Sequence, residues 1–338
     1  MRFGFNERCL DHDPGRRHPE SPDRLRAIRR ELARHHTARY ERPNPVDPAV
    51  LKAVHDPEYL DRVRELSAEG GGRWDPDTVV TEHTWDAVVA SAGLAVWATE
   101  RALEDPSDRD APFSLGRPPG HHAVADDAMG FCFANNVAVA TEHVVAERSY
   151  DCDRVALFDW DVHHGNGTQD LFYDRGDVLY ASIHEWDLYP GTGEPGETGD
   201  GEGAGATVNA PLRPGSGDAE YLAVVEDLIA PLVRNHDPDL LLVSAGFDAH
   251  RHDPISRMAV STEGYGALAD RIRAVADDLD AGLAFVLEGG YALNVLADSV
   301  ATVHETFAGY EPDPPDDDPD ESARELIDEQ RRRYGLDG

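Results

Sequence analysis

The sequence predicts an α/β fold built on a doubly wound, mostly parallel sheet. Short apolar runs with the character of buried strands alternate with amphipathic helical segments, which is the pattern of such a sheet. The length of 338 residues and a hydrophobic content of 40% suffice for one large α/β domain. No internal repeat divides the chain. We therefore expect a single domain over residues 1–308, followed by an acidic linker and a short helix over 309–338.

Each expected element follows from its own pattern. Apolar or β-branched runs predict buried parallel strands at 154–160, 177–184, 239–248 and 283–291, and weaker ones at 1–5 and 111–122. Helical spacing of apolar residues predicts helices at 22–36, 84–103, 135–147, 218–236 and 261–279.

Three stretches read as loops. The Gly-rich, acidic segment 185–207 is too long for an ordinary connection and indicates a functional loop, as does 117–136. The acidic, proline-rich stretch 309–322 predicts a disordered linker. A short charged helix at 323–334 is expected to pack on the surface.

The charge balance limits the classes of partner. With 66 acidic against 31 basic residues, the formal net charge is -35, and Lys52 is the only lysine. Such a chain repels nucleic-acid phosphates, and its acidic surface is typical of proteins that stay hydrated in concentrated salt. The absence of a signal-peptide pattern and of any apolar run near the roughly 20 residues of a membrane span predicts a cytoplasmic protein without membrane contact. Three cysteines without a CxxC pair argue against a disulfide framework or a cysteine zinc site.

Polar residues follow the expected strands where each strand ends. Because ligands of parallel sheets bind beyond the carboxyl ends of the strands, these side chains are expected to meet. They are Asp159, Asp161, His163 and His164; Ser182 and His184; Asp248, His250 and His252; Glu288 and Tyr291; and His121 and His122.

The first group predicts a metal site. Strand alternation would place Asp159, Asp161 and His163 on one side, and carboxylates held so close together require a cation. Asp161, His163 and, from another strand, Asp248 would supply two oxygens and one nitrogen. This set suits Zn²⁺ or Fe²⁺ and leaves a position open for water. A D-x-D or H-H pair alone is weak evidence, and histidines such as His55 are expected at the surface.

Taken together, several motifs resemble one family. They are HPESPDRL (18–25), RPPGHHA (117–123), GFCFANN (130–136), DWDVHHGNGTQ (159–169), YPGTGE (189–194), GFDAHRHDPI (246–255) and LEGGY (287–291). In this order they resemble the histone deacetylase superfamily, in its class II branch, which also includes acetoin-utilisation proteins and acetylpolyamine amidohydrolases. The resemblance covers about residues 1–308. It implies an arginase-like three-layer αβα fold with a central, mostly parallel sheet, and a zinc-dependent amide hydrolase.

The resemblance also assigns roles by position. It implies metal ligation by Asp161, His163 and Asp248. It further implies that Asp159 orients the first histidine of the pair and Asn166 the second, and it makes Tyr291 the catalytic tyrosine. The implied acyl-lysine tunnel and its rim comprise Gly130, Phe131, Tyr189, Ile255, Gly289, Gly290 and, by a looser match, Asp86. A structural K⁺ site is implied at Asp159, Asp161, His163, Ser182 and the backbone at Ile183.

These assignments predict hydrolysis of the amide of N-acetyl-lysine in proteins by a metal-activated water. His122 would act as the general base, His121 would stay more cationic, and Tyr291 would donate to the oxyanion. One alternative is deacetylation of small acetylated amines such as acetylpolyamines. An acidic rim favours this alternative, whereas the apolar Ile255 in the tunnel wall argues against it. Others are a binuclear arginase-type hydrolase, disfavoured by His164 and Asn166 where further carboxylates would be needed, and a non-catalytic acyl-lysine binding module.

Overall fold

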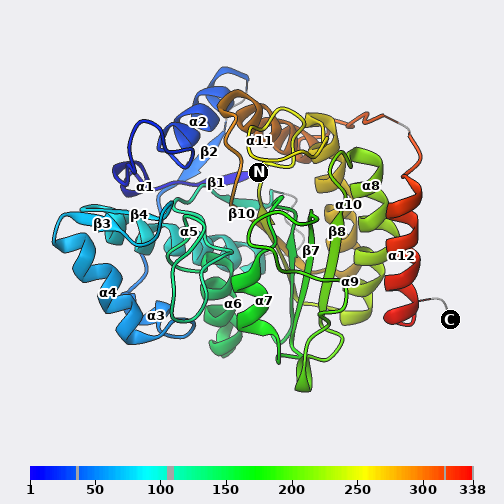
Figure 1. Ribbon diagram of the computed structural model, residues 1–338, viewed down its shortest axis with the longest axis horizontal. Helices are drawn as coiled ribbons and strands as arrows, with labels where there is room; N and C mark the ends of the chain where they lie inside the picture. Colours follow the sequence, from blue (N-terminus) through cyan, green and yellow to red (C-terminus); the bar gives the residue numbers. More distant parts are fainter. Residues whose placement is uncertain (36–37, 105–109, 316, 337–338) are drawn as a thin grey trace.

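The structure is a computed structural model that describes residues 1–35, 38–104, 110–315 and 317–336 (Figure 1). Its centre is an eight-stranded sheet in the order β2-β1-β5-β10-β9-β6-β7-β8, and all neighbouring strands are parallel. The strands are β1 Arg2–Gly4, β2 Arg39–Glu41, β5 Pro112–Ser114, β6 Val155–Asp159, β7 Val178–Glu185, β8 Thr207–Leu212, β9 Leu240–Ala245 and β10 Gly282–Leu287. A separate antiparallel hairpin joins β3 Gly71–Arg73 to β4 Val79–Thr81.

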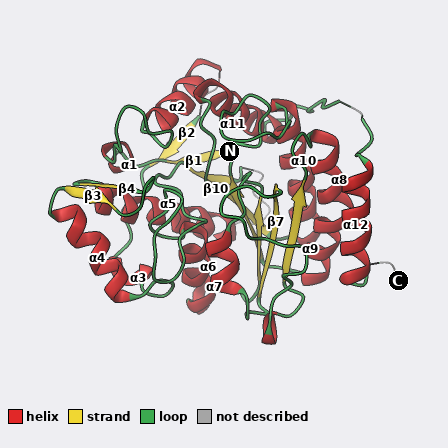
Figure 2. Cartoon of the chain, viewed as in Figure 1, coloured by secondary structure: helices red, strands yellow, loops and turns green. Residues whose placement is uncertain are grey.

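Helices cover both faces of the sheet (Figure 2). One face carries α2 Asp23–His35, α8 Asp218–Val224, α9 Ala230–His236, α10 Thr262–Leu279, α11 Leu293–Phe307 and α12 Glu321–Arg333. The other face carries α3 Pro48–Leu51, α4 Pro57–Ala68, α5 Thr84–Glu104, α6 Asn136–Ala146 and α7 Asn166–Phe172. The short α1 Arg8–Asp11 contributes Cys9 to the core. Within the described ranges, no helix is long and apolar enough to cross a membrane.

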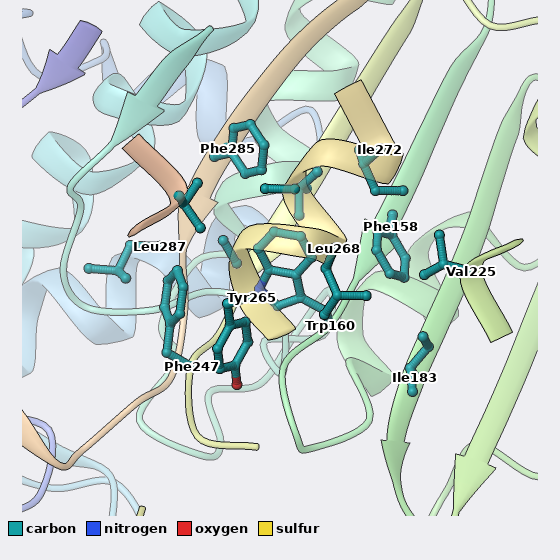
Figure 3. Close-up of a cluster of buried hydrophobic side chains, with 14 of the residues drawn as sticks. Phe158, Trp160, Ile183, Val225, Phe247, Tyr265, Leu268, Ile272, Phe285 and Leu287 are labelled. Carbon is teal, nitrogen blue, oxygen red and sulfur yellow. The ribbon is translucent and has the colours of Figure 1, made fainter. Parts of the chain in front are cut away.

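Strand alternation divides the core between these two faces. In β6, Ala156 and Phe158 belong to the cluster under α10, whereas Val155 and Leu157 belong to the cluster under α5 and α6. Trp160, which is fully buried, follows β6 and packs among aromatic side chains from neighbouring elements (Figure 3). The loop that carries the polar strand-end residues therefore starts from a rigidly packed base.

The predicted α/β class with its parallel sheet is confirmed, and the four strong strand predictions correspond to β6, β7, β9 and β10. The sequence reasoning missed β2, β8, the β3–β4 hairpin and the helices α1, α3, α4, α7 and α11. Strand β8 was missed because TVNAPL follows a Gly-rich loop and contains Pro211, which is tolerated there because β8 is the last strand of the sheet. The predicted helix 218–236 is one helical run, interrupted by a π-helical turn at Val225–Ile229 between α8 and α9.

The C-terminal segment lies against the sheet. Helix α12 buries Ala323, Ile327 and Gln330, and the Gln330 Nε2 donates to the carbonyl oxygen of Asn209 in β8 at 2.8 Å. The hydroxyl of Tyr334 donates to the carbonyl oxygen of Thr207. The stretch that leads to α12, expected to be a disordered linker, contains neither helix nor strand in its described residues, and Glu263 accepts hydrogen bonds from it, among them one from the backbone N–H of Asp313 at 3.1 Å.

Candidate active site

The three expected metal ligands meet beyond the carboxyl ends of β6 and β9. Ligand atoms of Asp161, His163 and Asp248 all lie within 4.8 Å of one another. His163 Nδ1 lies 3.0 Å from Asp161 Oδ1 and 3.3 Å from Asp248 Oδ2. Strand β6 ends at Asp159, so simple strand alternation does not carry as far as His163. The turn after the strand aims His163 at Asp161 instead, with the His163 N–H donating to Asp161 Oδ1.

The donor set fits a metal ion. Asp248 Oδ2 is buried and accepts no well-formed hydrogen bond, which is costly for a carboxylate oxygen unless a cation is bound. A side chain at Gly289 would collide with Asp248 Oδ2 and Asp161 Oδ2, so the glycine keeps the space beside both carboxylates open. Two carboxylates and one imidazole match the ligand types of Zn²⁺ and non-haem Fe²⁺ sites.

The tandem histidines stand next to this cluster with distinct partners. His121 Nδ1 lies 2.9 Å from Asp159 Oδ2, and its Nε2 lies 3.8 Å from Asp161 Oδ1. His122 Nδ1 lies 2.8 Å from the side-chain oxygen of Asn166. Because that amide oxygen can only accept, His122 Nδ1 carries the proton, and its Nε2 is left with a free electron pair.

The surroundings move the pKa values of the two histidines apart. Burial lowers the pKa of His121, but the carboxylates of Asp159 and Asp161 outweigh it and raise it to about 10. Burial lowers the pKa of His122 well below its usual value, and the positive charges of His121 and His163 lower it further. The first ring is therefore held as a cation and the second as a neutral base.

Two aromatic rings flank the histidine and tyrosine side chains. Tyr189 meets His122 edge to face at 5.1 Å between ring centroids, and Phe131 meets Tyr291 in the same way at 5.9 Å. Phe131 has a φ of 70°, a left-handed conformation that costs a bulky residue of the order of 1 kcal/mol or more. Gly130 also has positive φ, and a side chain there would collide with His122.

Tyr291 follows β10 on a loop fixed from two sides. The carboxylate of Asp253 accepts hydrogen bonds from the backbone N–H groups of Tyr291 at 2.6 Å and Ala292 at 3.0 Å. The buried Arg24 donates to the carbonyl oxygens of Gly290, at 2.7 Å, and Glu288. Gly290 has a φ of 113°, which favours glycine at this turn.

Sequence reasoning assigned no role to Asp253, Arg24 or Glu288. Glu288 Oε2 accepts hydrogen bonds from the backbone of Gly120 and His121, so it positions the loop that carries the histidine pair. Its place at the end of a predicted strand was visible in the sequence. Its contact with the loop that carries His121 was not visible, because Glu288 and that loop are more than 160 residues apart in the sequence.

The residues of the expected K⁺ site lie on two neighbouring strands and the turn after β6. Asp159 is the register partner of Ser182 in the β6–β7 ladder, and both are buried. The Ser182 hydroxyl is hydrogen-bonded to His184 Nδ1 at 2.9 Å. Ile183 is the next residue of β7 and is fully buried.

Other expected positions lie in different surroundings. Asp86 is exposed in the first turn of α5 and pairs with Arg8 at 3.6 Å. Ile255 is half-buried in the loop after β9, where its N–H donates to Asp253. His164 points away from the metal ligands, to Thr192 and Gln169.

The expectation that His55 lies at the surface is wrong. The ring is 2% exposed, and its nitrogens contact the carbonyl oxygen of Val124 and the backbone N–H of Asn135. It joins the segment between α3 and α4 to the middle and the end of the loop between β5 and α6, a long-range role that a lone histidine does not signal.

Comparison with known proteins agrees with this geometry. Residues 18–307 match the family model for the histone deacetylase domain. The chain is 36% identical to the histone deacetylase-like amidohydrolase of Pseudomonas aeruginosa, over 86% of this chain and 81% of that protein. It is 38% identical to a probable deacetylase of Archaeoglobus fulgidus, over 86% of this chain and 80% of that protein.

Two solved structures have the same fold. The crystal structure of the HDA15 HD domain superposes with a TM-score of 0.89 at 32% identity, covering 98% of this chain and 93% of that one. An acetylpolyamine aminohydrolase from Burkholderia pseudomallei superposes with a TM-score of 0.80 at 32% identity, covering 91% of this chain and 98% of that one. The chain therefore belongs to the histone deacetylase family and is a hydrolase of the deacetylase type.

Proposed function

We propose that this protein is a zinc-dependent deacetylase that hydrolyses the amide of N-acetyl-lysine in proteins. One observation carries the proposal: a cluster with the composition of a metal site lies beside two histidines, of which His121 is paired with the carboxylate of Asp159 and His122 with the neutral amide of Asn166. Amide hydrolysis needs such a division, because a base must take a proton from water and a cation must stabilise the developing negative charge.

Asp161, His163 and Asp248 would hold the metal, with Zn²⁺ as the proposed ion and Fe²⁺ as the alternative. When bound, the ion polarises the substrate carbonyl and acidifies a water. Burial lowers the pKa of His163, but the carboxylates of Asp161 and Asp248 outweigh it and raise the pKa to about 10, so metal binding must displace a proton from this ring.

The remaining side chains divide the proton transfers. His122 Nε2 takes a proton from the attacking water and later delivers one to the leaving lysine amine, while Asn166 keeps its Nδ1 protonated. His121, held cationic by Asp159, stabilises the negative charge that develops beside Asp161. The hydroxyl of Tyr291 donates to the oxyanion.

The substrate tunnel is proposed between Phe131 and Tyr189, with Gly130, Gly289 and Gly290 leaving room for the acyl group. Ile255 would add an apolar wall, and Asp86 would act at the outer rim. A structural K⁺ ion is proposed between β6 and β7, held by Asp159, Asp161, His163, Ser182 and the backbone of Ile183. Its support is the pairing of buried Asp159 with Ser182.

Metal analysis coupled to a substrate panel tests the function. The full chain is loaded with Zn²⁺ or Fe²⁺ and assayed on acetyl-lysine peptides and acetylated polyamines in parallel. We expect one equivalent of metal per chain, turnover of the peptides and loss of turnover with a chelator. Turnover of the polyamines alone would establish the small-amine alternative. Metal-loaded protein inert towards a broad acyl panel would indicate a binding module.

A further inference from the structure

A cavity of about 500 Å³ lies against the tunnel wall residue Phe131. Two segments far apart in the sequence form most of it: the loop 14–19 after α1, and the β3–β4 hairpin with its turn. In Figure 1 both segments lie on the same side of the molecule, next to α1 and α4. Because Phe131 also meets Tyr291, the cavity and the proposed reaction centre share this one aromatic ring.

The cavity is built from ordered contacts. His18 bridges its two sides: Nε2 lies 2.8 Å from the carbonyl oxygen of Asp77 in the hairpin turn, and the ring meets Phe131 edge to face at 4.7 Å. Asp75 fixes the turn by accepting from the backbone N–H of Thr78 and, at 2.9 Å, from its hydroxyl. The same hydroxyl oxygen accepts the N–H of Phe131 at 3.3 Å.

The charge of the cavity is opposite to that of the chain. Its lining contains Arg16, Arg17 and Arg73 against the single carboxylate of Asp77, whereas the whole chain has a net charge of -35. Many exposed arginines elsewhere pair with a carboxylate, as Arg154 does with Asp237. None of the three cavity arginines forms an ion pair within the part of the chain that the structure describes; Arg73 donates only to the carbonyl oxygen of Pro76 among the hydrogen bonds found there.

We propose that this cavity binds a carboxylate of the substrate, carried by an aspartate or glutamate that flanks the acetylated lysine in an extended protein segment. Arginine forks are suited to carboxylates, and here three of them face a space with a single competing carboxylate. An extended chain advances about 3.3 Å per residue, so a residue within a few positions of the lysine reaches a cavity that borders the tunnel wall. The same charges repel polyamines. The inference rests on the proposed deacetylase function and adds a sequence preference to it.

The test compares three peptides that differ only at the residues flanking acetyl-lysine: Glu, Gln or Lys on both sides. For the zinc-loaded full chain at low salt, we expect kcat/KM to be about tenfold higher for the Glu peptide than for the Gln peptide, mainly through KM, and lowest for the Lys peptide. In the triple variant Arg16→Gln, Arg17→Gln, Arg73→Gln, the preference should disappear while kcat/KM on the Gln peptide changes less than about twofold.

A matched triple variant removes the same charge elsewhere: Arg30→Gln, Arg148→Gln, Arg332→Gln, all exposed. This variant should keep the preference for the Glu peptide. The comparison thereby separates the effect of a local binding site from the effect of the net charge of the chain. Binding of the same peptides, labelled and followed by fluorescence polarisation, gives a readout without turnover. Equal kcat/KM and equal affinity for the Glu and Gln peptides would overturn the inference and leave the deacetylase function standing. Failure to hydrolyse any of the three peptides would overturn both.

Discussion

Two buried charge clusters in this protein contain similar groups and differ in how those groups are satisfied. In the first, the carboxylate of Glu20 accepts from Arg117 at 2.6 Å to each oxygen, and from Arg24 at 3.3 Å. The remaining guanidinium donors reach backbone carbonyl oxygens, including those of Gly290 and His12. Every charge in this cluster has a partner within the chain.

The second cluster is short of positive charge. It gathers three carboxylates, Asp159, Asp161 and Asp248, around His121 and His163, and Asp248 Oδ2 accepts no well-formed hydrogen bond from the described residues. A self-satisfied cluster holds segments of the chain together, whereas a cluster with an unmatched anion is built for a cation from outside. We therefore infer that the first cluster has a structural role and that the second cluster binds a metal ion.

The largest effect should come from Asp248→Asn. This change removes one anionic ligand at nearly constant shape, so we expect metal content well below one equivalent and a fall in kcat/KM of more than about 1000-fold. Metal analysis and kinetics measure both. Asp218→Asn is the control, since Asp218 is a buried carboxylate that holds Ser261 instead. If Asp248→Asn kept its full metal content, the second cluster would be a scaffold like the first.

Tyr291→Phe separates chemistry from metal binding. Loss of one oxyanion donor should lower kcat by about 10²–10³-fold while metal content stays at one equivalent. Tyr310→Phe, which removes a surface hydroxyl that donates to Glu263, should leave kcat unchanged. An unaltered kcat in Tyr291→Phe would remove the tyrosine from the proposed mechanism.

Glu20→Gln tests the first cluster through stability. Breaking a buried pair of this kind should lower the free energy of unfolding by about 3 kcal/mol at pH 7. Burial raises the pKa of Glu20, but Arg117 and Arg24 outweigh it and lower it from 4.5 to about 2. The carboxylate therefore stabilises the fold above pH 4.5, and that contribution is lost as the pH falls towards 2.

Urea unfolding at several pH values measures this effect. The difference between wild type and Glu20→Gln should be constant above about pH 5 and should shrink below it. Glu82→Gln, at an exposed carboxylate, should show no such difference. If the difference in unfolding free energy between wild type and Glu20→Gln increased on acidification, Glu20 would not be the ionised partner of Arg117 and Arg24.

The smallest functional effect is expected at His164. This ring is buried beside the second cluster, yet it contacts Thr192 at 2.8 Å and Gln169 at 3.0 Å. His164→Phe should cost about 1–3 kcal/mol of stability through the polar groups left unpaired, with metal content retained. Thermal unfolding together with metal analysis checks this prediction. Loss of metal without loss of stability would instead show that His164 takes part in metal binding.

The second cluster is easier to predict from the sequence than the first. Aspartates and histidines at strand ends point to one edge of a parallel sheet, so the sequence alone groups Asp161, His163 and Asp248. Glu20 lies in the segment before α2, Arg24 lies in α2, and Arg117 lies in the loop after β5. Nothing in their spacing along the sequence indicates that they meet. Glu288 and Asp253 act on backbone N–H groups of distant loops, which leave no side-chain signal in the sequence.

The tail helix α12 has a consequence for solubility. Strand β8 is the last in the sheet, and the carbonyl oxygens of Thr207 and Asn209 face outwards from it, where Tyr334 and Gln330 cap them. An uncapped outer strand offers a ready template for strands of other molecules. A chain shortened before Glu321 would therefore expose these two carbonyl groups at the edge of the sheet. We expect such a chain to self-associate before it loses activity.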